Sequence, residues 1–355
     1  FSRDVAQTNR NRDEYVVSGP IGSAPAAAAA LQGAGATLIS FRDLGALDRR
    51  VMLFDLGRQI DLGSAQQLLT QRTPNQLIDF NNLYRFAQAP RLYASSLVGD
   101  ETIGACRLSQ NQKIGLIDGP VDLSHPALQG AAISIESALI EGQRPVNGQH
   151  GTGVAALMVG EDPNGALSGF ASGARLFAVD AFAREHNEVA ADVDRIGASL
   201  NWLLASDVRL INMSFTGPSN RVLADLLEQS KNAGAIMIAS AGNDGSNAGM
   251  LPAVSPSVIA VTAVDAAMRR YRSANWGTHI EFAAPGVDVY VARNNGGGYA
   301  TGTSYASPII TALAARIGAT SVTALRRKLR SQSFDLGNPG WDAEFGWGLV
   351  RNIDC

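Results

Sequence analysis

The residues best suited to chemistry in this 355-residue chain stand where apolar runs begin or end. Ser304 precedes the apolar stretch 309–315, whose helical periodicity predicts that the serine opens a helix. Its hydroxyl would then lie beside unsatisfied backbone N–H groups and the positive end of the helix dipole. Pro308 is expected within the first turn or so, where a missing N–H costs little. This position suits a nucleophile, and it equally suits an ordinary helix cap.

Three further polar residues could supply what a serine nucleophile needs. Asp118 ends the apolar run 114–117, His150 precedes a helix with small early residues, and Asn243 lies in a tight polar loop. Taken singly, these residues are also typical of a turn, a cap or a core position. Together they match acyl-transfer chemistry: an imidazole accepts the serine proton, a carboxylate orients the imidazole, and an amide stabilises an oxyanion. Asp, His, Ser is also a known triad order along a chain.

The elements that must position these residues follow one pattern from residue 113 onward. Short apolar runs predict strands buried on both faces, and the stretches 191–205 and 221–233 predict crossover helices. The fold class is therefore α/β, with a mostly parallel sheet and helices on both faces. The predicted strands are 114–117, 176–179, 210–213, 236–239 and 258–261. Ligands of such folds collect at the carboxyl ends of the strands.

The N-terminal region has a smaller pattern. Residues 1–13 are polar and are expected to form a leader. Residues 14–90 predict a small α+β domain, with a linker to about residue 112 and the large domain at 113–355. The order of elements is β-α-β-β-α-β: the predicted strands are 15–17, 36–41, 51–56 and 77–84, and the predicted helices are 25–32 and 64–71.

Composition and charge exclude several classes of function. A net charge of −3 leaves no basic footprint for nucleic acid, and no run of about 18 uncharged apolar residues predicts a membrane span. The first residues lack an apolar signal region, so any signal peptide is expected to be absent from this chain. Cys106 and Cys355 are either reduced buried thiols or one disulfide, which would suit an exported protein; neither has the neighbours of a zinc ligand.

Six segments, in order, resemble the motif series of the subtilisin-like serine proteases. They spread over nearly all of 113–350 and read IGLIDGPVDLSHPAL (114–128), HGTGVAALMVG (150–160), INMSFTGP (211–218), ASAGNDG (239–245), FAAPGV (282–287) and GTSYASP (302–308). The resemblance implies a serine endopeptidase with Asp118, His150 and Ser304 as its triad. It also implies that Asn243 and the Ser304 N–H donate to the oxyanion. The chemistry requires no cofactor.

The resemblance also implies where a protein or peptide substrate lies. An extended peptide would pair with the backbone of one cleft wall and face the opposing strand 184–188. The residues of that wall are Ser214, Phe215, Thr216 and Gly217, and Ala241 and Gly242 form the far wall of the primary pocket. Gly119 and Pro120 depart from the family pattern after Asp118, which bears on the support of its carboxylate. Structural calcium is common in the family, and no ligand is assigned among the acidic residues Asp122, Glu161, Asp162 and Asp265.

The small domain resembles the propeptides of these proteases. Such propeptides assist folding and then inhibit, so the chain is expected to be an exported zymogen whose own propeptide is its intramolecular inhibitor. Processing is expected between Tyr84 and Ser96, with Ala87–Gln88 as the preferred bond.

Two other classes of function compete with this interpretation. Residues 151–156 fit the loose dinucleotide fingerprint G-x-G-x-x-A, but the preceding segment is polar and is not a strand. The second alternative is a propeptide-locked, proteolytically silent relative that serves as a binding module. Covalent labelling of Ser304 separates this module from an enzyme.

Overall fold

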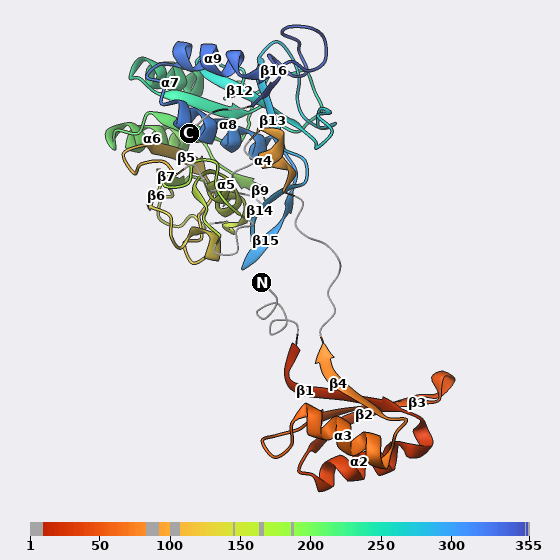
Figure 1. The fold of residues 1–355 in the computed structure, drawn as a ribbon. Helices are drawn as coiled ribbons and strands as arrows, with labels where there is room; N and C mark the ends of the chain where they lie inside the picture. The colour runs from red at the N-terminus through yellow and green to blue at the C-terminus, as the bar shows by residue number, and fades with distance from the viewer. Residues whose placement is uncertain are drawn as a thin grey trace. The chain divides into compact units, whose positions relative to one another are not determined.

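The chain folds into two compact units, Phe1–Ala89 and Pro90–Cys355 (Figure 1). The structure is a computed structural model and describes residues 10–82, 92–99, 107–144, 146–162, 167–185, 188–351 and 353. Cys106, Cys355 and the Ala87–Gln88 bond lie outside these residues. Each unit has a hydrophobic core of its own.

The smaller unit is an antiparallel sheet with two helices on one face (Figure 1). Its described strands are β1 (Arg10–Gly19), β2 (Thr37–Leu44), β3 (Arg49–Asp55) and β4 (Leu77–Asn82), in the spatial order β2-β3-β1-β4. The helices are α2 (Ala24–Gly33) and α3 (Leu62–Arg72). The predicted α+β order is confirmed. The first strand begins at Arg10, within the segment expected to be a leader.

Alternation along the strands explains the core of the smaller unit. Phe54 points under the helices and packs with Leu31 of α2 and Leu69 of α3, and all three are buried. Some large apolar side chains of this unit are exposed to solvent. Phe41 on β2 and Leu77 on β4 are 58% and 74% exposed.

The larger unit is built on a wide, mostly parallel sheet, as predicted. Nine strands of the described chain follow the order β16-β17-β13-β12-β11-β10-β5-β7-β6, and only β16 runs antiparallel to its neighbour. They are β5 (Lys113–Asp118), β6 (Ile133–Ser137), β7 (Arg175–Asp180), β10 (Leu210–Met213), β11 (Ile236–Ser240), β12 (Val258–Val264), β13 (Ile280–Pro285), β16 (Ser333–Phe334) and β17 (Leu349–Val350). Two hairpins stand apart, β8 (Ala183–Glu185) with β9 (Glu188–Ala190) and β14 (Val289–Arg293) with β15 (Gly296–Ala300).

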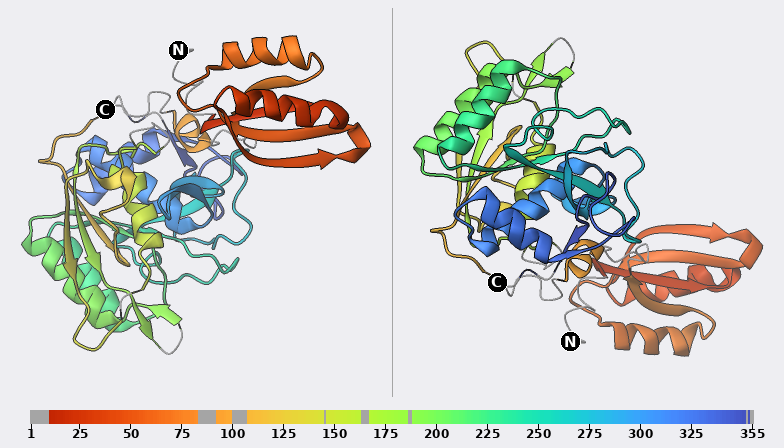
Figure 2. Two further views of the ribbon diagram at one scale, coloured as in Figure 1. Left: turned by 90° about the horizontal axis from the view of Figure 1, so that it is seen from below. Right: turned by 90° about the horizontal axis from the view of Figure 1, so that it is seen from above.

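Helices cover both faces of this sheet (Figure 2). On one face lie α5 (Gln149–Val159), α8 (Thr303–Ile317) and α9 (Val322–Ser331), and on the other α6 (Val193–Ala205) and α7 (Arg221–Asn232). The strand order changes direction around β5, between β10 and β7. Since open α/β sheets bind ligands at such a switch point, outside the carboxyl ends of the strands, the site is expected beyond Asp118.

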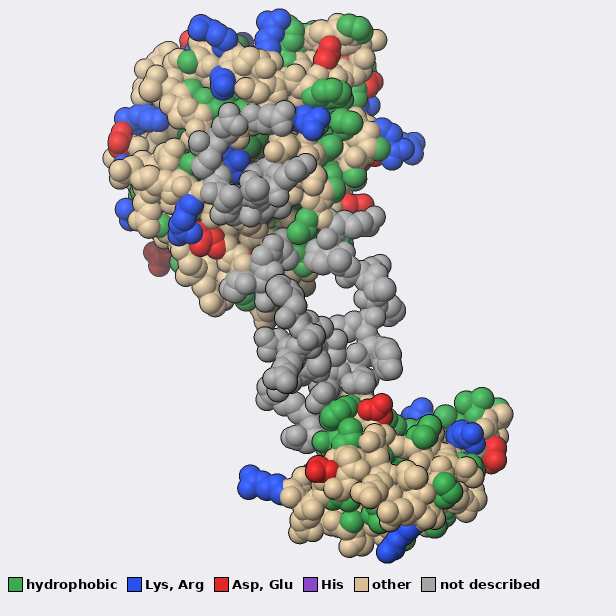
Figure 3. Space-filling view, viewed as in Figure 1, with side chains coloured by type: hydrophobic (Ala, Val, Ile, Leu, Met, Phe, Trp, Pro, Cys, Tyr) green, Lys and Arg blue, Asp and Glu red, His purple; other side chains and the backbone are tan. Residues whose placement is uncertain are grey.

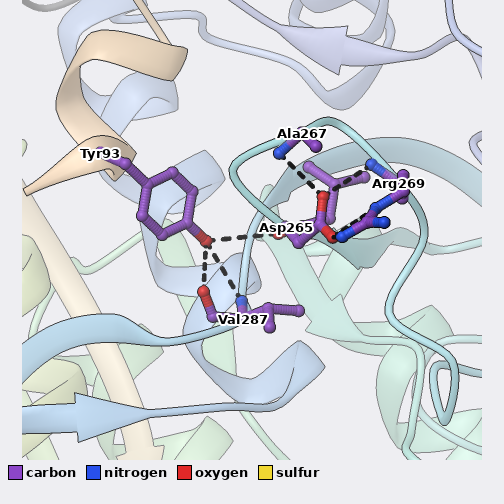
Figure 4. Close-up of polar contacts among 6 residues, drawn as sticks. Tyr93, Asp265, Ala267, Arg269 and Val287 are labelled. Carbon is purple, nitrogen blue, oxygen red and sulfur yellow. Dashed lines mark hydrogen bonds and ion pairs between the residues drawn. The ribbon is translucent and has the colours of Figure 1, made fainter. Parts of the chain in front are cut away.

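The short helix α4 (Tyr93–Leu97) is tied to the body of the larger unit by one phenol (Figure 4). The Tyr93 hydroxyl donates to the carbonyl oxygen of Val287 at 2.6 Å and accepts from the Val287 N–H at 3.3 Å. Burial raises the pKa of Tyr93 to about 12, so the phenol stays protonated and remains a donor. Helix α4 therefore belongs to the larger unit.

The surface of the larger unit carries charges of both signs. On the face shown in Figure 3, Lys and Arg side chains are interspersed with Asp and Glu rather than gathered into one patch. In the described part of the chain, no single helix is long and apolar enough to cross a membrane. Helices α8 and α9 are long and apolar enough only when taken together, and they meet at a bend of 103°.

Candidate active site

The carboxylate of Asp118 and the imidazole of His150 meet at the end of β5. The His150 Nδ1 lies 2.8 Å from the Asp118 Oδ1, which also accepts the N–H of Gly119 at 2.7 Å. A carboxylate only accepts, so Nδ1 carries the proton and Nε2 is left as the acceptor. The start of α5 packs closely against the residue after β5 because residue 151 is glycine. A Cβ on Gly151 would lie 2.4 Å from the Gly119 carbonyl oxygen.

Burial and charge act against each other on this pair. The side chain of Asp118 is 5% exposed, whereas that of His150 is 42% exposed. Burial of the imidazole disfavours its charged form, but the charge of Asp118 and its hydrogen bond outweigh burial and raise the pKa of His150. The imidazole is therefore a stronger proton acceptor than an isolated histidine.

Ser304 stands in the first turn of α8, as the sequence predicts. The ring of the following residue, Tyr305, lies 5.5 Å from the ring of His150, so the starts of α5 and α8 are neighbours. A Cβ built on Gly302 would lie 3.2 Å from the Ser304 Oγ and 3.4 Å from the Asn243 Nδ2. The serine hydroxyl and the Asn243 amide thus converge on one point.

Thr303 determines which way the Asn243 amide faces. The Asn243 Oδ1 accepts the Thr303 N–H at 2.9 Å and the Thr303 hydroxyl at 3.1 Å. The same hydroxyl accepts the Gly242 N–H at 3.1 Å, which fixes its own proton toward Asn243. With its oxygen held on both bonds, the amide presents its N–H₂ end away from Thr303.

The predicted place of Pro308 is wrong. It lies inside α8, beyond the first turn, and is fully enclosed by the core. The backbone bond that residue 308 would donate to the Ser304 carbonyl is therefore missing from the helix. The Ser214 hydroxyl donates to that carbonyl instead, at 2.9 Å.

An apolar cavity of about 290 Å³ adjoins Asp118 and His150. Phe182 and Phe215 line it and contact each other edge to face, with ring centroids 5.5 Å apart. The predicted opposing strand 184–188 falls on the hairpin of β8 and β9, whose residues Arg184 and Val189 also line the cavity. Val146, Asn147, Gly119 and Ser214 complete the lining.

The backbone of the predicted substrate wall 214–217 is only partly free to pair with a peptide. Gly217 exchanges both backbone hydrogen bonds with Leu251, at 2.7 and 3.1 Å, which removes Gly217 from the edge open to a peptide. Within the predicted run, Ser214 and Phe215 line the cavity. The side chain of Ser214 is buried, so only its backbone could meet a substrate.

Asn275 supports the far wall and was not predicted. Its Oδ1 accepts the Asp244 N–H at 2.9 Å, and its Nδ2 donates to the Ala241 carbonyl oxygen at 3.1 Å. Its Nδ2 would lie 2.4 Å from a Cβ on Gly242, whose φ is +103°, so this turn requires glycine. No local motif surrounds Asn275 that would mark it in the sequence.

Three of the four acidic residues considered for calcium have partners within the protein. Glu161 pairs with Arg107, and Asp265 accepts the guanidinium of Arg269 at 2.8 Å. Asp122 accepts both the N–H and the hydroxyl of one serine. Among the residues that the structure describes, no three His, Cys, Asp or Glu side chains gather as a metal site.

Comparisons with known proteins agree with this arrangement. The model of the subtilase family matches residues 109–348, which is most of the chain. The fold is that of the subtilisin-like serine peptidases, and the chain belongs to the subtilase family.

Individual relatives support the same family. A thermophilic serine proteinase of Bacillus sp. (strain AK1) is 34% identical over 211 residues, which cover 58% of this chain and 52% of that protein. Subtilisin DY of Bacillus licheniformis is 32% identical over 255 residues, 68% of this chain and 89% of the relative. The solved structure of sphericase has a TM-score of 0.64 at 23% identity and covers 75% of this chain and 99% of its own. The chain spans about half the length of the first of these relatives.

Proposed function

We propose that this chain is a serine endopeptidase that hydrolyses peptide bonds through Asp118, His150 and Ser304. The observation that carries the proposal is the 2.8 Å bond between the His150 Nδ1 and the Asp118 carboxylate, near the first turn of α8, which contains Ser304. This bond leaves the His150 Nε2 as the base for the serine proton. The family membership of the chain supports the same chemistry.

In the proposed reaction, the Ser304 Oγ attacks the peptide carbonyl carbon as His150 takes its proton. The tetrahedral oxyanion is stabilised by the Asn243 Nδ2 and the Ser304 N–H, which has no partner within the first turn of α8. His150 then protonates the leaving amine, and an acyl-enzyme forms on Ser304. Water, deprotonated by His150, hydrolyses this ester and restores the serine.

The shape of the cleft favours an extended peptide with large apolar side chains before the cleaved bond. Phe182 and Phe215 offer aromatic surface, and Val189 at the rim is 53% exposed. A matched pair of peptides with Phe or Ser at each upstream position tests this preference. Equal kcat/KM for all such pairs would remove it.

We also propose that the smaller unit is a propeptide that assists folding and then inhibits. Its β-α-β-β-α-β fold, which resembles the propeptides of these proteases, supports this role. Export of the enzyme and a Cys106–Cys355 disulfide belong to the same proposal. Mass spectrometry of the unreduced chain, with and without alkylation, tests the disulfide.

Labelling with a fluorophosphonate tests the enzyme against the silent binding module. The reagent forms a bond to an activated serine, so we expect the wild-type chain to be labelled at Ser304 once residues 1–90 are removed. The Ser304→Ala variant is the control and should take up no label. Failure of the wild type to react in either state would favour the binding module.

A further inference from the structure

The carbonyl group of the nucleophilic residue lacks its helical hydrogen bond. In an α-helix the N–H of residue i donates to the carbonyl of residue i−4, so residue 308 would serve Ser304. Pro308 has no N–H, yet α8 continues past it to Ile317. An unpaired carbonyl at this point would leave the peptide that follows Ser304 without one of its restraints.

The hydroxyl of Ser214 occupies the missing donor's place. It comes from the segment after β10, 90 residues earlier in the chain, and lies 2.9 Å from the Ser304 carbonyl oxygen. A hydroxyl has one proton. Because the Ser214 hydroxyl donates its proton to the Ser304 carbonyl, Ser307 must be the donor in the 3.1 Å contact between the Ser214 and Ser307 hydroxyls.

A buried amide holds the Ser214 hydroxyl in this orientation. The Asn212 Nδ2 donates to the Ser214 Oγ at 2.8 Å, and the Thr311 hydroxyl lies between the Asn212 Oδ1, at 3.1 Å, and the Ser307 carbonyl oxygen, at 2.9 Å. Asn212, Ser307 and Thr311 are 0% exposed, and Ser214 is 6% exposed. Polar groups so deeply buried are costly unless they are satisfied, so the network has little freedom to rearrange.

We infer that Ser214 is a positioning residue for the nucleophile, acting as the hydrogen-bond donor that Pro308 cannot provide. This inference rests on the proposed function of Ser304. The bond holds the carbonyl of Ser304 against the end of β10, and with it the direction in which the Ser304 Oγ leaves the helix. The cleft-wall role predicted for Ser214 then belongs to its backbone, while its side chain serves the catalytic serine.

A double-mutant cycle tests the inference. Ser214→Ala removes the donor, and we expect kcat and the rate of fluorophosphonate labelling to fall about 10- to 100-fold with little change in KM. Pro308→Ala restores a backbone N–H that can donate to Ser304. In the Pro308→Ala background, the further change Ser214→Ala should cost about threefold or less. Losses that simply multiply in the double variant would overturn the inference.

Ser199→Ala is the matched control. Ser199 is also a buried serine, and its hydroxyl donates at 2.6 Å to the carbonyl of Arg195 within α6, away from the catalytic residues. We expect this variant to lower stability without changing the labelling rate. If Ser214→Ala fails to fold, recovery of folding and labelling by added Pro308→Ala supports the inference, and no recovery overturns it.

The wild-type chain separates this inference from the proposed function. A wild type that takes up no label contradicts the proposed protease. A reactive wild type together with an equally reactive Ser214→Ala variant contradicts only the positioning role. The pH midpoint of labelling should be the same in both, because in the described part of the chain the Ser214 hydroxyl bonds to Asn212, Ser304 and Ser307 and to neither Asp118 nor His150.

Discussion

At the scale of single residues, two opposing effects determine the pKa of the His150 imidazole. Burial favours its neutral form, while the charge and hydrogen bond of Asp118 favour the cation and win, so the pKa of His150 is raised. Catalysis needs the neutral base. The acid limb of the rate profile should therefore lie above the ordinary histidine pKa of about 6.5.

Replacing the carboxylate should reverse that balance. In Asp118→Asn the attraction is lost and burial remains, so the pKa of His150 falls and the acid limb moves to lower pH. The rate should drop by about 10⁴, because the wrong tautomer of the imidazole is favoured. The pH dependence of kcat/KM measures both effects. A profile whose midpoint stays in place would contradict the assigned pairing.

A second buried carboxyl lies beside Asp118. Asp180 ends β7 and is the direct partner of Asp118 in the parallel ladder. It is 9% exposed, and its Oδ1 has no hydrogen-bond partner among the described residues. Burial raises the pKa of Asp180 to about 6, and the charge of Asp118 adds to this effect, against the Phe182 N–H and Arg195.

Asp180 should therefore lower the stability of the folded chain at neutral pH. Because its folded pKa exceeds its unfolded value of 3.8, the destabilisation is absent below pH 3.8, grows up to about pH 6 and is constant above. We expect Asp180→Asn to raise the free energy of unfolding by about 1–3 kcal/mol at pH 7 and to change it little at pH 3.5. Denaturant titrations at the two pH values measure this. The exposed Asp225→Asn is the control, and an equal gain at both pH values would refute the account.

At the scale of elements, helix α4, which lies within the segment predicted as a linker, is anchored next to the turn that leads to Ser304. The Tyr93 hydroxyl bonds to Val287 (Figure 4), and the neighbouring Gly286 carbonyl accepts the Gly302 N–H at 2.8 Å. Gly302 caps α8 just before Ser304. Removal of the segment before α4 leaves this anchor in place.

Tyr93→Phe should remove the hydrogen bonds to Val287 and keep the packing of the ring. The phenyl ring keeps the packing, while the Val287 backbone loses the hydroxyl, so we expect a loss of about 1–3 kcal/mol in the free energy of unfolding. Thermal unfolding of the processed enzyme measures it. Tyr290→Phe is the control, since the hydroxyl of Tyr290 donates to none of the described residues. Equal effects of both variants would show that the anchor adds nothing.

Elements also mark where prediction from sequence succeeds. The strands at 114–117 and 176–179 were predicted because burial on both faces requires continuous apolar runs. Strand β6 was missed because it is an edge strand whose polar, exposed residues show no such run. Pro308 was misplaced because the sequence motif does not reveal that a serine from another segment supports the helix at that point.

At the scale of the whole molecule, the proposed propeptide role of the smaller unit predicts a maturation step. If the smaller unit is a propeptide, the chain should cut itself between Tyr84 and Ser96. N-terminal sequencing of wild type incubated at neutral pH should find a new terminus there, and Ser304→Ala should stay intact. The same cut in purified Ser304→Ala would mean that another protease makes it. Mixing the variant with active enzyme then tells cleavage between molecules from cleavage within one.

The sequence by itself determined the family and the fold class, and it predicted Asp118, His150, Ser304 and Asn243 as the catalytic residues. Residue type and local spacing carry that information, since each of these side chains lies at the start or end of a predicted element. Only the tertiary structure decided how they are held: Ser214 on the Ser304 carbonyl, Thr303 on the Asn243 amide, and Asn275 behind the far wall. These three contacts join residues that are 90, 60 and 34 positions apart in the chain. Local periodicity cannot encode such pairs, because they exist only once β10, β11 and α8 have packed.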